Sequence, residues 1–178
     1  PANVLIDEQG CAFVNDFGLA KDVRIGGSGA VESEALTVSG EILGTPEYMS
    51  PEQAMGGSEK VGPASDQFSL GAVLYEVLTR RRPFAGATLR DLLNAVARAD
   101  PVPPHVLDPR TPRDLETICL KALEKDPARR YASMADLAAD LQRILDGEPI
   151  RARPVSTMTR LLRQAVKYRR TLIPAALG

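Results

Sequence analysis

The sequence predicts a mainly α-helical fold that begins with a short β-hairpin, and three observations support this prediction. Two apolar runs near the N-terminus flank a glycine-containing turn, which is a hairpin pattern. Several segments with helical spacing of apolar residues follow from residue 64 onward. Aromatic residues make up only 4% of the 178 residues and Trp is absent, so aliphatic side chains must fill most of the core. This composition suits packed helices and allows one domain of ordinary size.

The predicted hairpin has strands over residues 3–7 and 11–15, joined by a turn at residues 8–10. Between residues 21 and 41 the chain is rich in Gly, Ser and small residues, and neither a helical nor a strand period is sustained. We therefore expect a long loop there. Loops of this length in compact domains are usually functional or disordered.

The segment 64–79 is apolar on more than one face, which indicates a helix at the centre of the fold. Ser65 or Asp66 is placed to cap its start. Proline-rich residues 101–104 predict an extended link. Further amphipathic helices are expected over residues 88–98, 113–123 and 133–145.

Charge divides the chain into two parts, with a net charge of −8 through Ile150 and +7 from Arg151 onward. The sequence therefore predicts one domain over residues 1–146 and a basic tail over 147–178. The tail leads into an apolar run at 171–178, shorter than the roughly 20 residues of a membrane-spanning helix. The basic tail has two possible interpretations. It is either a juxtamembrane segment that precedes a membrane-spanning helix or a solvated amphipathic tail. Nucleic-acid binding is disfavoured because no aromatic residues interleave with these charges.

The two cysteines, Cys11 and Cys119, lie far apart and show no metal-ligand spacing. Neither a disulfide framework nor a zinc site is predicted, and a reducing cytoplasm is the simpler compartment.

Asn3 and Asp16 flank the predicted hairpin, so hairpin formation would bring an amide oxygen and a carboxylate together. Hard cations such as Mg²⁺ prefer oxygen ligands of this kind, with phosphate supplying others. Taken singly, each residue also fits an ordinary role in a turn.

The motifs around these residues resemble the signature set of serine/threonine protein kinases, in order and spacing. The resemblance covers Pro1 to about Leu145. It rests on the Asp-Phe-Gly of residues 16–18, on residues 44–52 (GTPEYMSPE), on Asp66 with residues 69–71, on residues 81–84 (RRPF) and on residues 126–130 (DPARR). It implies the C-terminal lobe of a eukaryotic-type kinase of the bacterial receptor-like kind, with a hairpin and a long activation loop but without the N-terminal lobe.

This resemblance implies a role for each matching residue. Asp16 would chelate the Mg²⁺ that bridges the β- and γ-phosphates of ATP, and Asn3 would hold a second metal. Leu5 would form the floor under adenine. Phe17 would set the position of the aspartate, and Gly18 would supply the backbone freedom for its movement.

Thr45 resembles the residue that hydrogen-bonds the catalytic base beside the substrate hydroxyl in serine/threonine kinases. Thr37 and Ser39 lie in the expected activation segment, where phosphorylation would add negative charge and order the loop. For each of these two hydroxyls, a solvated loop residue is the alternative.

The remaining matches are structural. Glu52 resembles a carboxylate that pairs with a distant arginine, here Arg130. Asp66 would accept backbone N–H groups of the catalytic loop from below.

The implied function is transfer of the γ-phosphate of ATP to Ser or Thr hydroxyls of protein substrates. In the family the catalytic base precedes the metal-binding asparagine by five residues, a position upstream of Pro1. We therefore expect this chain to be inactive by itself. A pseudokinase acting as a scaffold is the alternative, although such a protein has no need of a metal-binding pair. The expected partners are protein substrates, ATP and a second kinase copy for trans-autophosphorylation, and the kinase domain is expected in the cytoplasm, anchored to the plasma membrane if a span follows.

Overall fold

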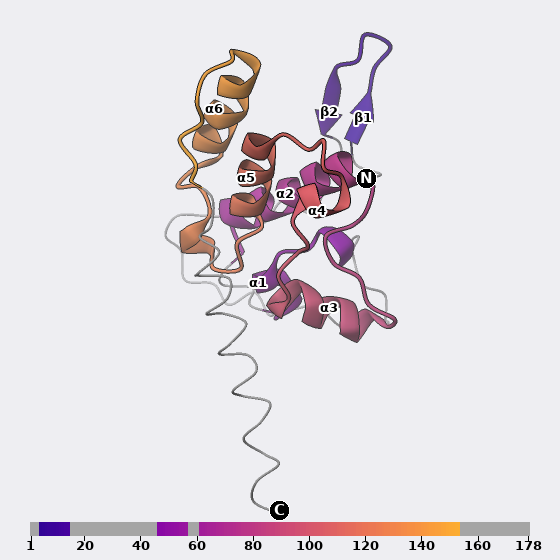
Figure 1. The fold of residues 1–178 in the computed structure, drawn as a ribbon. Coiled ribbons are helices and arrows are strands. Elements are labelled where there is room, and N and C mark those ends of the chain that lie inside the picture. The colour runs from indigo at the N-terminus through magenta and orange to yellow at the C-terminus, as the bar shows by residue number, and fades with distance from the viewer. Residues whose placement is uncertain (1–3, 15–45, 57–60, 154–178) are drawn as a thin grey trace, which may run out of the picture. The chain divides into compact units, whose positions relative to one another are not determined.

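The computed structural model describes residues 4–14, 46–56 and 61–153, and the chain divides into two units, residues 1–44 and 45–178. The first unit contains the antiparallel hairpin of β1 (Val4–Ile6) and β2 (Ala12–Val14), drawn in indigo in Figure 1. Its turn is closed by the Asp7 carboxylate, which accepts the backbone N–H groups of Gln9 at 2.9 Å and Cys11 at 2.8 Å. The predicted hairpin is therefore present, with each strand shorter than expected.

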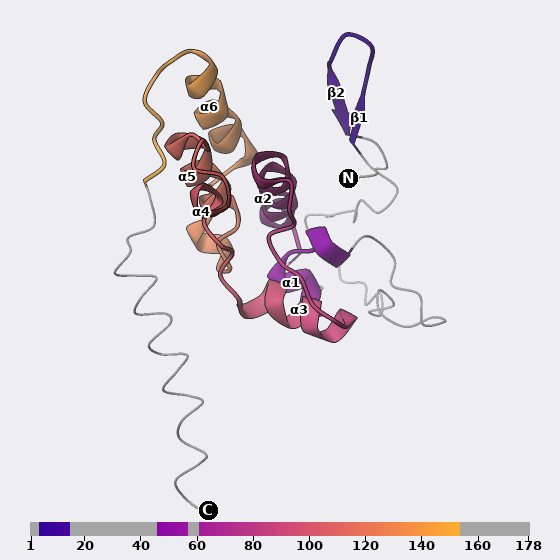
Figure 2. The same cartoon turned by 45° about the vertical axis from the view of Figure 1, so that its right-hand side comes forward.

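The second unit is helical. Its elements are η1 (Pro46–Tyr48), α1 (Pro51–Ala54), α2 (Pro63–Thr79), α3 (Leu89–Arg98), α4 (Pro104–Leu107), α5 (Arg113–Ala122), η3 (Pro127–Arg129) and α6 (Met134–Leu145). Helix α2 lies at the centre of this unit, α5 and α6 pack beside it, and α1 and α3 lie together at one end (Figures 1 and 2). The mainly helical fold class predicted from the sequence is confirmed.

The structure corrects the predicted start of the central helix. Helix α2 begins at Pro63, so its N-cap residue is Gly62 and not Ser65 or Asp66. Proline is favoured at the first helical position because its missing N–H would have no partner there. Ser65 still contributes to the start of the helix from its third position, since its side-chain oxygen accepts the N–H of Gly62 at 3.3 Å, and its hydroxyl donates to Glu52.

The link after α3 differs from the prediction only at its last residue, because residues 101–103 are not helical. The prolines of residues 101–104 indicate an extended segment, yet Pro104 starts the short helix α4. Proline is favoured at the first position of a helix, although it disrupts a helix interior.

The main core lies between α2 and α5. Phe68, Ala72 and Tyr75 of α2 are buried there, together with Cys119 of α5. At Gly71 the two helices approach so closely that a Cβ atom would lie 2.9 Å from the Cβ of Ala122. A larger residue at this position would push the helices apart.

A second apolar cluster joins α5 and α6 to the chain that follows them. Its buried members include Ile118, Leu137 and Ala152, and Ile150 packs against it. The chain therefore remains packed on the helical unit as far as Ala152. Among the described residues, no helix has the length and apolar character needed to cross a bilayer.

Candidate functional site

The hairpin adjoins both predicted metal-binding residues in the sequence. Val4 follows Asn3, Val14 precedes Asp16 by two residues, and Val4 is the cross-strand partner of Val14. Leu5 pairs with Phe13 and is 51% exposed. An exposed apolar side chain on β1 is compatible with the predicted contact with a base, although no contact within the described residues tests it.

Most of the predicted catalytic residues lie outside the described part of the chain. These residues are Asn3, Asp16, Phe17, Gly18, Thr37, Ser39 and Thr45. Their roles stay predictions. Among the residues that the structure does describe, no group of three or more His, Cys, Asp or Glu side chains could hold a metal ion.

The segment that follows Thr45 is held firmly against the central helix. The Tyr48 hydroxyl donates to a carboxylate oxygen of Glu76 at 2.6 Å, and the Ser69 hydroxyl donates to the carbonyl of Tyr48 at 2.8 Å. A salt bridge joins Glu47 of η1 to Arg82, just beyond the end of α2. Side chains of α2 and of the residues after it therefore fix the position of η1.

Glu52 of α1 and Arg130 form a buried ion pair across 78 residues of sequence. The two guanidinium NH₂ groups donate separately to the two carboxylate oxygens, at 2.8 and 2.9 Å. Arg130 also donates to the carbonyls of Ala64 at 2.6 Å and Glu124 at 2.8 Å. Ser65 donates to Glu52 at 2.7 Å. A single ion pair thus ties α1, the start of α2 and the chain after α5 together.

The electrostatics of this pair favour its charged form. Burial by itself would raise the pKa of Glu52, but hydrogen bonds from Arg130 and Ser65 outweigh it and lower the pKa to about 2. The arginine side chain has no exposed surface and that of Glu52 is 3% exposed, so the pair depends on its own hydrogen bonds.

Asp66 has an exposed side chain on the first turns of α2. The catalytic-loop amides that it would accept are not among the described residues, so its role stays a prediction.

Lys125 forms a contact that the sequence did not indicate. Its ammonium nitrogen lies 3.6 Å from the ring centroid of Phe84 and 5.3 Å from that of Phe68, and it donates to the carbonyl of Val96 at 2.6 Å. The two rings are stacked, with centroids 6.0 Å apart. The Arg130 guanidinium covers Phe68 at 5.1 Å, so this aromatic cluster borders the buried ion pair.

We expect stability to depend on the protonation of Lys125. Burial lowers its pKa to about 7, against the opposing attraction of Asp100. Because an unfolded lysine stays protonated up to about pH 10.4, unfolding takes up a proton between these pH values, and stability then rises with pH.

The measurement is the unfolding free energy of the wild-type chain minus that of Lys125→Met. It should increase from pH 7 to pH 9, by less than the one-proton limit of about 1.4 kcal/mol per pH unit. A difference that stays constant over this range would show that Lys125 remains charged in the folded chain.

Asp140 of α6 is a second buried carboxylate that sequence reasoning missed. It is 1% exposed and accepts the backbone N–H groups of Arg151 at 2.8 Å and Ala152 at 2.9 Å. The Tyr131 hydroxyl donates to it at 3.2 Å and Arg143 at 3.3 Å. Burial opposes the charge, but the two amides lower the pKa of Asp140. No sequence signal reveals the contact with residues 151 and 152, because there the partners are backbone groups in an irregular segment.

Comparison with known proteins agrees with this arrangement. The family model for the protein kinase domain matches residues 1–141. The chain is 40% identical over 157 residues to the serine/threonine-protein kinase PknB of Mycobacterium tuberculosis, covering 88% of this chain and 24% of that protein. It is 40% identical over 152 residues to a probable serine/threonine-protein kinase of Streptomyces coelicolor, covering 85% and 21%, and 37% identical over 149 residues to a probable PknB of Bifidobacterium longum, covering 83% and 20%.

The chain thus spans about a quarter or less of the length of these relatives. The match includes the hairpin, the Glu52–Arg130 ion pair and the helices from α1 to the middle of α6. On this sequence match, and with a helical unit of the expected class, the chain belongs to the protein kinase domain family.

Proposed function

We propose that the protein containing this chain transfers the γ-phosphate of ATP to Ser or Thr hydroxyls of protein substrates. The observation that supports this most strongly is the ordered set of kinase motifs from Asn3 to Arg130, because two members of it, Glu52 and Arg130, meet as a buried ion pair in the fold. Such a pair stabilises the fold, whereas the proposed phosphate transfer is inferred from membership of the protein kinase domain family.

The chain supplies oxygen ligands of the kind that Mg²⁺ prefers, an amide at Asn3 and a carboxylate at Asp16. The pairing of Val4 with Val14 is consistent with this role, since it joins the two strands that adjoin Asn3 and Asp16 in the sequence. When bound, the metal would neutralise phosphate charge. Leu5 would support the base of ATP, and Thr45 would orient the acceptor hydroxyl.

Regulation and location are proposed on the same basis. Phosphorylation of Thr37 or Ser39 by a second kinase copy would order the segment that carries Phe17 and Gly18. The basic tail beyond Arg151 supports attachment of a cytoplasmic kinase domain to the membrane. Retention of both Asn3 and Asp16 favours catalysis over the pseudokinase alternative.

The test uses the protein encoded by the complete reading frame that contains this chain. This protein is incubated with radiolabelled ATP, Mg²⁺ and a generic protein substrate. Phosphate incorporation on Ser or Thr is expected. Asp16→Asn should reduce it at least about 100-fold, since the variant weakens the metal site on which charge neutralisation depends. Asp7→Asn is the matched control, because it makes the same change at the exposed hairpin turn, and it should retain activity.

Phosphate transfer that survives Asp16→Asn would contradict the assigned metal role. Absence of transfer by the complete protein, together with retained partner binding, would favour the scaffold. The 178-residue chain by itself is expected to incorporate no phosphate, and incorporation by it would contradict the upstream position of the base.

A further inference from the structure

Three consecutive arginines follow the central helix. Helix α2 ends at Thr79, and Arg80, Arg81 and Arg82 are all exposed. Arg80 is the one non-glycine residue with positive φ in the described part of the chain, at φ 55° and ψ 24°. Glycine or asparagine is favoured in this left-handed conformation after a helix, because a Cβ atom is strained there. The helix end favours a nearby cation, but it does not account for an arginine in the strained position.

Only the third arginine forms an ion pair within the described part of the chain, and this pair joins it to η1. Arg82 pairs with Glu47. The nearby carboxylates are also engaged, because Glu76 accepts the Tyr48 hydroxyl and Asp108 binds Arg110 through two hydrogen bonds of 3.0 and 2.9 Å.

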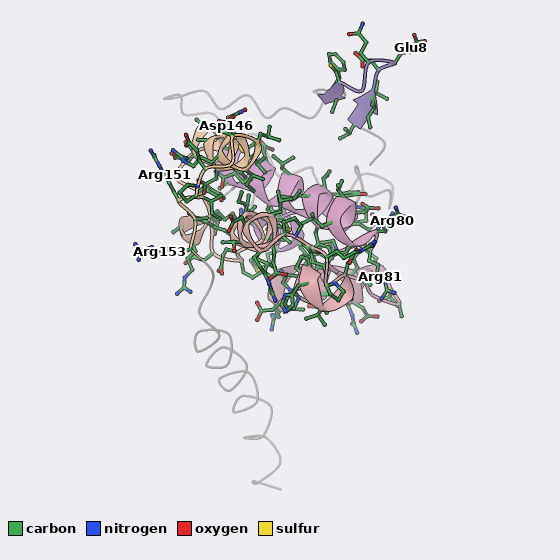
Figure 3. All side chains as sticks on the ribbon, turned by 45° about the horizontal axis from the view of Figure 1, so that its top comes forward. Glu8, Arg80, Arg81, Asp146, Arg151 and Arg153 are labelled. Atoms are coloured by element: carbon green, nitrogen blue, oxygen red, sulfur yellow. The ribbon has the colours of Figure 1, made fainter. Side chains whose placement is uncertain are left out.

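The side chains of Arg80 and Arg81 make no hydrogen bond or ion pair with any residue that the structure describes. They project from the end of the helical unit away from Arg151 and Arg153 (Figure 3). Hydrogen bonds from Arg110 lower the pKa of Asp108, and the charge of Arg80 adds a smaller effect in the same direction. Two exposed guanidinium groups therefore remain without a hydrogen-bonded anionic partner among these residues, next in sequence to the Arg82 that contacts η1.

We propose that Arg80 and Arg81 form a subsite for an acidic side chain of the peptide substrate. The inference rests on the proposed function, because that function places Thr45 beside the acceptor hydroxyl and η1 begins at the next residue. A peptide whose hydroxyl reaches Thr45 and whose chain continues along η1 would pass Arg82, which pairs with Glu47, and so approach the two arginines that precede it. Guanidinium groups bind carboxylates through paired hydrogen bonds, which makes arginine suitable for such a contact.

The first measurement is the ratio of kcat/KM for two threonine peptides, one with glutamates near the threonine and one with glutamines in their place. The enzyme in this assay is the protein encoded by the complete reading frame. We expect the acidic peptide to be preferred by roughly 5- to 20-fold at low salt, with the preference decreasing as salt increases. The double variant Arg80→Gly/Arg81→Ala should lose most of this preference. Arg153→Ala removes an exposed arginine at the opposite side of the unit (Figure 3) and should keep it.

The second measurement uses the 178-residue chain, with fluorescence anisotropy of the same labelled peptides and thermal unfolding. Tighter binding of the acidic peptide is expected for the wild-type chain and not for the double variant. Arg80→Gly alone should raise the Tm, because glycine relieves the left-handed strain. If Arg80→Gly has a higher Tm and yet binds the acidic peptide less well, the weaker binding is not caused by a loss of folding.

The results of these two measurements show whether the arginines form the proposed subsite. Equal kcat/KM for the two peptides, or a preference that survives in the double variant, overturns it while leaving kinase activity intact. If the complete protein phosphorylates no peptide, the proposed function fails, and equal binding of the two peptides by the 178-residue chain then overturns the subsite as well. A preference for a phosphothreonine peptide over the glutamate peptide overturns the carboxylate assignment.

Discussion

Replacing Arg130 with leucine is expected to lower the free energy of unfolding of the chain by about 3 to 5 kcal/mol. The variant leaves the Glu52 carboxylate buried without its two guanidinium hydrogen bonds, and it leaves the carbonyls of Ala64 and Glu124 without their donor. Urea denaturation followed by circular dichroism measures the change. Arg129→Leu is the matched control, since the ion pair that Arg129 forms with Asp126 is exposed, and it should change stability by less than about 0.5 kcal/mol.

Acid should reproduce part of this loss. The pKa of Glu52 is about 2 in the folded chain, against an ordinary value of 4.5. A carboxyl group with a lowered folded pKa stabilises the fold above its unfolded pKa and loses that contribution as pH falls toward the folded value. The wild-type chain should therefore lose stability between about pH 5 and pH 2 relative to Glu52→Gln. Equal acid sensitivity of the two proteins, or a stable Arg130→Leu chain, would contradict the assigned role of the pair.

The second large effect is expected for Asp140→Ala, which should destabilise the chain by about 2 to 4 kcal/mol. Alanine leaves the Tyr131 hydroxyl and the amides of Arg151 and Ala152 without their acceptor at a buried position. We also expect the segment after α6 to detach, so that protease cleaves the variant between residues 146 and 153 faster than the wild-type chain. Mass spectrometry of limited digests measures this cleavage.

Asp136→Ala serves as the control on the same helix. Asp136 is exposed and contacts the N-cap Ser133, so its loss should cost less than about 1 kcal/mol. If Asp140→Ala is no less stable than this control, or if its cleavage rate between residues 146 and 153 is unchanged, Asp140 does not hold the exit segment.

The sequence predicted the regular elements well where a repeating pattern was long. The α2 segment could be identified because its apolar residues recur over four turns, and α3, α5 and α6 each have one apolar face. Helix starts were less predictable. Pro63 and Pro104 both open helices, although a proline in the sequence equally marks an extended link.

The candidate site was predicted through the resemblance of its motifs and not through pattern alone. Nothing in residues 46–56 or 124–130 shows by itself that Glu52 must meet Arg130, because 78 residues separate them. The arginine run was visible in the sequence, but its place beside η1 and the left-handed backbone of Arg80 were not.

The sequence by itself determined the helical class, the hairpin, the order of the kinase motifs and the change from an acidic domain to a basic tail. These features depend on local periodicity, turn residues and residue identity, which are properties of neighbours in the chain. Only the tertiary structure decided which charges are buried, that Asp140 holds the backbone at Ala152, that Lys125 lies against Phe84, and that Arg80 and Arg81 form no hydrogen bond or ion pair with the described residues. Burial and pairing arise when segments distant in sequence pack together, so no single segment contains that information.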